Sequence, residues 1–119
     1  MADFGLALAW GVPVRGREQK ALEVFMEGQE VFDKAQANSE ISGFETVLFQ
    51  ASGGGLPGGH TIAWGSEDQI DALARSDGFI RLGNRAGLIV DGVAVGRCVR
   101  GEALATGIGG YGAEIAGLT

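Results

Sequence analysis

The first apolar segment of the chain alternates large and small side chains with a period of two. The large side chains are Phe4, Leu6, Leu8, Trp10, Val12 and Val14, and the small residues between them are Gly5, Ala7, Ala9 and Gly11. A period of two is typical of a β-strand, and apolar residues on both faces predict a central strand that is covered on both sides. We expect the small face to admit a helix at close range.

The next segment changes to the period of a helix. Between Arg17 and Asn38 apolar residues recur at spacings of four and three, and most carboxylates lie off that stripe. The stripe comprises Ala21, Phe25, Gly28, Phe32 and Ala35. This spacing predicts an amphipathic helix of about six turns.

Two strand patterns follow, over Phe44–Ala51 and His60–Gly65, and the glycine-rich stretch 52–59 between them predicts a loose hairpin. In the second of these strands His60, Ile62 and Trp64 share one face. A second helical region then begins with a capping box formed by Ser66 and Gln69, and it pauses at residues 76–78.

The last strand pattern covers Val93–Arg100, so the order of elements is βαββαβ with a tail. This order predicts an α+β, ferredoxin-like fold, with a four-stranded antiparallel sheet and two main helices on one face. We expect one domain over residues 1–119, with a core at about 4–100. The tail, 101–119, carries Leu104, Ile108, Tyr111 and Ile115 at helical spacing, but its glycines predict a weak helix. Exchange of this tail onto a partner subunit is one use that we consider for it.

The second face of such a sheet would be apolar and bare. A second copy packed on it about a two-fold axis would cover it, so we expect a homodimer. Three stretches, 16–25, 44–49 and the broken helix at 73–82, resemble the dimeric α/β barrel superfamily. The chain is similar to small uncharacterised bacterial proteins of this type. The superfamily includes cofactor-free monooxygenases, lactone isomerases, haem-dependent enzymes and regulatory domains, so membership does not select a function.

Composition excludes several classes of protein. With 9 basic and 15 acidic residues among 119, the net charge is −6, which argues against general nucleic-acid binding. One cysteine and one histidine form neither an internal disulfide nor a common zinc site. No apolar run is long enough to span a bilayer, and Asp3 precedes the segment Phe4–Val14 where a signal peptide would be positive. We therefore expect a cytoplasmic protein without membrane or nucleic-acid partners.

His60 is the candidate catalytic residue, because a histidine can act as a base near neutral pH. The alternative is an exposed histidine at the edge of the sheet. Trp10 and Trp64 are candidate ligand-binding residues, because they lie on strands expected to be adjacent and could form the walls of an aromatic pocket. They could equally fill the dimer core.

Arg97 is the third candidate ligand-binding residue, since it alternates with Val95 and Val99 on an otherwise apolar face. A buried arginine needs a partner, such as Glu45, a bound carboxylate or an acidic residue across the subunit interface. Residues 75–100 contain five arginines and two aspartates. This positive charge could attract an anionic ligand or the acidic helix of a neighbouring subunit, or it could form a solvated face. Cys98 is expected to be a small buried residue without a lowered pKa.

These observations leave two function hypotheses. The first is a small-molecule site of a cofactor-free monooxygenase or isomerase that acts on an aromatic or polyketide-like compound. His60 would be its base, Trp10 and Trp64 its walls, and Arg97 its anion holder. The alternative is a non-catalytic dimeric binding or assembly module. We predict no cofactor and no metal; haem, a third option, would depend on His60 as its axial ligand.

Overall fold

The computed structural model describes residues 2–50 and 58–118, so most of the predicted hairpin loop at 52–59 lies outside the described residues. The predicted order of elements is confirmed. The elements are β1 (Phe4–Trp10), α1 (Glu18–Ala37), β2 (Gly43–Leu48), β3 (Gly59–Gly65), α2 (Glu67–Arg75), α3 (Asp77–Gly87), β4 (Ala94–Val99) and α4 (Gly101–Gly117).

The four strands form one antiparallel sheet in the order β2-β3-β1-β4. β1 and β3 are therefore the inner strands, as the sequence predicts. Ala7 lies opposite Ile62 of β3 and Gly96 of β4, and Glu45 of β2 also lies opposite Ile62. Because residues directly opposite in antiparallel strands project from the same face, this register assigns every strand residue to one of two faces.

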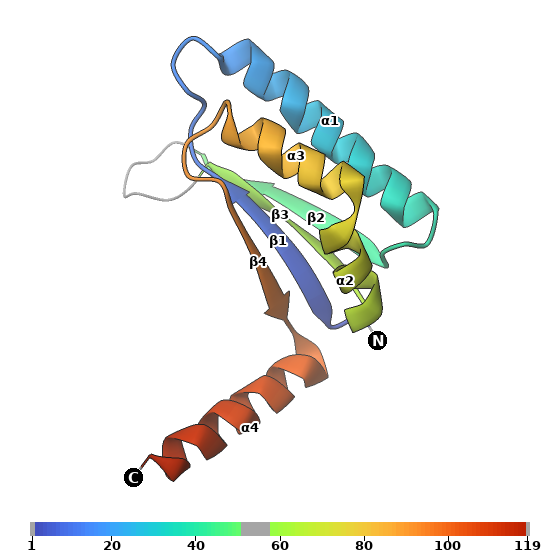
Figure 1. Cartoon of the computed structure of the whole chain (residues 1–119), viewed down its shortest axis with the longest axis vertical. Coiled ribbons are helices and arrows are strands. Elements are labelled where there is room, and N and C mark those ends of the chain that lie inside the picture. Colours follow the sequence, from blue (N-terminus) through green and yellow to red (C-terminus); the bar gives the residue numbers. More distant parts are fainter. Residues whose placement is uncertain (1, 51–57, 119) are drawn as a thin grey trace.

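Helices α1, α2 and α3 all cover one face of the sheet (Figure 1). They pack on the large side chains of β1, where Leu6 and Leu8 are buried, and not on the small face as we expected. Burial of a leucine contributes about 1.5–3 kcal/mol, so the helices gain most from the face that offers most apolar area. Phe32 of α1 completes this core, stacking on Phe44 at 5.4 Å and meeting Phe79 edge to face at 6.4 Å between ring centres.

The predicted break in the second helical region separates α2 from α3. Ser66 caps α2: its hydroxyl accepts a hydrogen bond from the Gln69 amide at 3.2 Å, and the Gln69 side-chain oxygen accepts one from the Ser66 amide at 2.8 Å. Ser76 ends α2 and caps α3, because its hydroxyl donates to Leu73 and accepts from the Phe79 amide. The two caps stabilise the first turns of α2 and α3.

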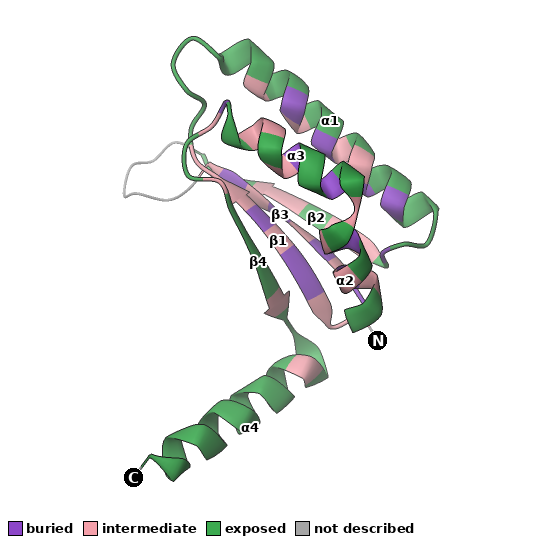
Figure 2. Ribbon diagram, viewed as in Figure 1, coloured by how far each residue is buried: buried purple, intermediate pink, exposed green. Residues whose placement is uncertain are grey.

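No helix of the described residues covers the opposite face of the sheet. We call it the open face. Its apolar or aromatic members are Ala7 and Ala9 of β1, Val47 of β2, His60, Ile62 and Trp64 of β3, and Ala94 and Cys98 of β4. The predicted weak tail helix is also present as α4, which extends away from the sheet and buries none of its residues (Figure 2).

Candidate functional site

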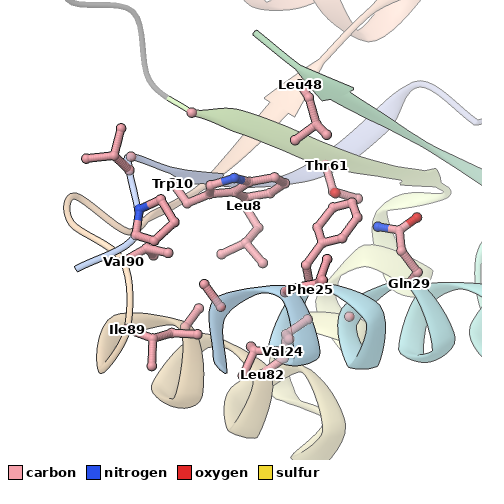
Figure 3. A pocket seen from close by; sticks show the side chains of 18 of the residues that line it. Leu8, Trp10, Val24, Phe25, Gln29, Leu48, Thr61, Leu82, Ile89 and Val90 are labelled. Atoms are coloured by element: carbon pink, nitrogen blue, oxygen red, sulfur yellow. The ribbon is translucent and has the colours of Figure 1, made fainter. Parts of the chain in front are cut away.

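A pocket of about 390 Å³ lies between the helix-covered face of the sheet and helices α1 and α3 (Figure 3). Leu8 and Trp10 of β1 form its sheet side, and Val24 and Phe25 of α1 face them. Leu82 of α3 closes the far side. This volume is in the range of small-molecule sites, and the lining is predominantly apolar, as such sites usually are.

The aromatic wall of the pocket is formed by Trp10 and Phe25, which meet edge to face with ring centres 6.0 Å apart. Glycine on the neighbouring strand makes room for the indole. A Cβ atom at Gly59 would lie 3.1 Å from the Trp10 ring and 2.5 Å from the carbonyl oxygen of Val47. Gly59 therefore lets Trp10 lie flat against the sheet, where its ring faces the cavity.

One chain of hydrogen bonds supplies the polar part of the wall. The Gln29 amide nitrogen donates to the Thr46 hydroxyl at 3.0 Å, and the Thr46 and Thr61 hydroxyls are 2.8 Å apart. Thr61 and Gln29 line the pocket, and Thr61 is only 1% exposed. Either hydroxyl of the Thr46–Thr61 pair can be the donor, and the Thr46 hydroxyl can also donate to the Gln29 side-chain oxygen at 3.4 Å. When Thr46 donates to Thr61, the Thr61 hydrogen is available to a ligand.

The mouth of the pocket is rimmed by apolar side chains. Val12, Leu22 and Leu48 line it and are 54–65% exposed. Glu18 is the only titratable residue among the described lining residues, and its carboxylate accepts a hydrogen bond from the Gly16 amide at 2.9 Å. The pocket thus offers apolar surface and hydrogen-bonding groups, and its one charge lies at the rim.

The four residues singled out from the sequence do not meet in this pocket. Trp10 lines it, whereas His60 and Trp64 project from the open face on the other side of the sheet. His60 packs edge to face against Phe49 at 5.8 Å, and the Arg100 guanidinium lies 3.9 Å above the Trp64 ring. His60 therefore cannot act as a base on, or ligate a haem in, the pocket that Trp10 lines.

Arg97 has a different partner from those expected. It lies on the helix-covered face and pairs with Asp71 of α2 in the same chain, while Glu45 projects from the open face. The expected pairing with Glu45 is wrong because the register puts these two side chains on opposite faces. Arg85 likewise pairs with Glu27 of α1 at 2.9 Å, so the acidic helix it meets belongs to its own chain.

Cys98 is partly buried on the open face. Burial raises the pKa of its thiol, and the nearby Arg100 charge opposes that shift in part. This direction agrees with the predicted unreactive cysteine. Across residues 2–50 and 58–118 there is no group of three or more His, Cys, Asp and Glu side chains suited to a metal ion. Within the same ranges no helix has the length and apolar character to cross a membrane.

Sequence reasoning missed the hydrogen-bonded series Gln29, Thr46 and Thr61. Thr46 and Thr61 both lie at inward positions of a hairpin, and they are paired in its register. Once that register is known, two buried hydroxyls side by side are an available signal. The sequence does not supply the register, because the intervening loop can have several geometries.

Solved structures confirm the fold. A dimeric protein of unknown function with a ferredoxin-like fold from Bacteroides fragilis matches with a TM-score of 0.61 and 13% identity, over 82% of this chain and 95% of that one. A dimeric ferredoxin-like protein of unknown function from Jannaschia sp. CCS1 matches with a TM-score of 0.61 and 16% identity, over 82% of this chain and 99% of that one. SnoaB, a cofactor-independent oxygenase from Streptomyces nogalater, matches with a TM-score of 0.56 and 14% identity, over 85% of this chain and 95% of that one.

No family model and no curated protein matches the chain in sequence. At these identities the structural likeness concerns the fold alone. The chain is a ferredoxin-like α+β protein whose structural neighbours include dimers and an oxygenase, as the resemblance to the dimeric α/β barrel superfamily implies. The comparisons therefore establish the fold and identify no activity.

Proposed function

We propose that this chain forms a homodimer through its open face and that each subunit binds one small, largely apolar molecule in the pocket beside Trp10. The ligand carries a single oxygen that accepts a hydrogen bond from Thr61. The observation that supports this most directly is the 390 Å³ pocket whose deep polar group is the 1%-exposed Thr61 hydroxyl. Of the two directions that the Thr46–Thr61 hydrogen bond allows, the one in which Thr46 donates leaves the Thr61 hydrogen for an acceptor on the ligand.

The homodimer follows from the open face. Ala7 and Ile62 present apolar surface there that no helix of the described residues covers, and Trp64 lies beside them under the Arg100 guanidinium. A two-fold arrangement would bury the same patch of each subunit against its copy, which is the usual geometry of small homodimers. In that assembly Trp64 belongs to the interface and Trp10 to the ligand, so the two tryptophans have separate roles.

The ligand proposal is tested with two compounds of the same shape. 1-Tetralone carries a carbonyl oxygen, and tetralin lacks it. We expect Thr61→Val to weaken 1-tetralone binding about three- to tenfold, as the net loss of one hydrogen bond implies, and to change tetralin binding less than twofold. Ala21→Phe, which places a ring in the cavity, should abolish binding of both. Calorimetry that detects neither compound on the wild-type chain would refute the proposal.

The dimer proposal is tested by sedimentation equilibrium. Ile62→Glu introduces a charge at the centre of the open face, so we expect a dimer at least tenfold weaker than that of the wild-type chain. Ile80→Glu is the matched control, because Ile80 is an exposed residue of α3 on the other side of the sheet. Equal association of both variants would exclude the open face as the interface.

A second candidate function is a cofactor-free monooxygenase or isomerase that acts on an aromatic or polyketide-like compound. The structural likeness to SnoaB and the aromatic wall formed by Trp10 and Phe25 favour it. His60 would serve as base only for a substrate bound on the open face, because it lies across the sheet from the pocket. His60→Ala tests this role: unchanged turnover of every compound that the wild-type chain converts would remove His60 as the base.

A further inference from the structure

The outward surface of α4 is an apolar stripe. Its members recur at spacings of four and three, so they lie along one side of the helix, and they are 44–88% exposed. They are Leu104, Ile108, Tyr111, Ile115 and Leu118. Glu102 and Thr106 lie on the side of the helix opposite the stripe at 100° per residue, whereas Glu114 lies at its edge. The large apolar side chains of α4 are therefore on one side, its other side carries mostly small residues, and the described part of its own chain does not bury the large side chains.

The sequence of α4 makes isolated helix formation unfavourable. Four glycines, at 107, 109, 110 and 112, lie in its interior, and each disfavours the helical conformation relative to alanine. In proteins most of the stability of a helix comes from tertiary packing of its apolar side, and α4 buries no residue within the described part of its chain. A partner that covers the apolar stripe would supply that packing.

The start of α4 is fixed beside the open face. Gly101 turns the chain with φ +58°, and a Cβ atom at this position would lie 2.7 Å from a carboxylate oxygen of Asp3. The preceding residue, Arg100, lies over Trp64, which projects from the open face. A copy seated on the open face would therefore lie next to the first turn of α4.

We infer that α4 is an exchanged arm, which packs its apolar stripe against the second copy in the dimer. This inference rests on the open-face dimer proposed above, because that dimer brings the second copy to the base of α4. A membrane surface fits less well as the occupant. Residues 101–118 contain no lysine or arginine and two glutamates, so anionic lipid would repel the helix.

The test compares two double variants of the whole chain, each of which adds two negative charges to one side of α4. Ile108→Glu/Ile115→Glu alters the apolar stripe, and Thr106→Glu/Ala113→Glu adds the same charge to the opposite side. We expect the first variant to weaken the dimer at least tenfold and the second less than threefold by sedimentation equilibrium. Since α4 buries no residue in its own domain, the thermal midpoint of domain unfolding, measured for each variant as a monomer, should be unchanged in both.

Amide hydrogen exchange supplies a second readout. In the wild-type chain the amides of α4 should exchange slowly at concentrations where the dimer dominates, and at least tenfold faster after dilution to monomer or in Ile62→Glu. Equal exchange of α4 in monomer and dimer would overturn the arm. Loss of dimer in Ile62→Glu, with the apolar-stripe variant associating like its control, would overturn the arm and leave the open-face dimer standing. The reverse pattern would overturn the open-face dimer instead.

Discussion

Trp10 and Trp64 lie on neighbouring strands of the sheet and project from opposite faces of it. Trp10 is paired with Gly59 and Trp64 with Gly5, so each indole lies beside a glycine on the adjoining strand. A Cβ atom at Gly5 would lie 2.9 Å from the Trp64 ring, and one at Gly59 would lie 3.1 Å from the Trp10 ring. A glycine on the adjoining strand thus makes room for each indole, so that the Trp10 ring lies against the pocket and the Trp64 ring lies on the open face.

Single-tryptophan variants should separate ligand binding from dimerisation. We expect 1-tetralone to quench the fluorescence of Trp64→Phe, which keeps Trp10 in the pocket wall, and to leave that of Trp10→Phe nearly unchanged. Dilution through the dimer dissociation should shift the emission of Trp10→Phe, since that variant reports the open face. If the ligand quenched both variants equally, the two faces would not be functionally separate.

The capping box at the start of α2 should have a measurable effect on stability. Ser66→Ala removes the hydroxyl that accepts from Gln69, and loss of such a cap costs about 1 kcal/mol. Urea unfolding followed by circular dichroism measures the difference. Ser42→Ala, a change at an exposed serine outside the helices, is the control and should alter the free energy of unfolding by less than about 0.5 kcal/mol. Equal effects of the two changes would contradict a specific role for the cap.

The ion pair between Arg97 and Asp71 should contribute little to stability. Their side chains are 55% and 36% exposed, and pairs in contact with solvent typically contribute less than about 1 kcal/mol. A double-mutant cycle with Arg97→Met and Asp71→Asn measures the coupling directly. Neither change should weaken the dimer, because the pair lies on the helix-covered face. A tenfold weaker dimer in Arg97→Met would instead support the ion pair across subunits that the sequence allows.

Cys98 should react slowly with alkylating reagents. Because burial raises the pKa of its thiol, a smaller fraction is thiolate at pH 8 than in an unstructured peptide, and only the thiolate reacts. We expect the rate with iodoacetamide to lie below that of the urea-unfolded chain and to rise steadily as the pH increases from 8 to 10. Arg100→Met should slow the reaction further, since the arginine charge favours the thiolate. A faster rate in the folded chain would contradict this environment for Cys98.

Local sequence patterns suffice to predict the elements of this fold. The period of two in β1, the spacing of four and three in α1, and the Ser66–Gln69 capping box each depend on residues close together in the chain. These signals can be recognised without knowledge of the rest of the molecule. The order of elements then leaves few arrangements, because connections between them are short.

Only the tertiary structure decided which side chains share a site. The alternation in β1 identifies two faces and does not say which of them the helices cover; the larger apolar area of Leu6 and Leu8 decides that. The register between strands is equally long-range: it separates His60 from Trp10, pairs Thr46 with Thr61, and puts Arg97 within reach of Asp71. The sequence by itself thus determined the elements and their order, whereas the composition of the pocket depended on packing between residues far apart in the chain.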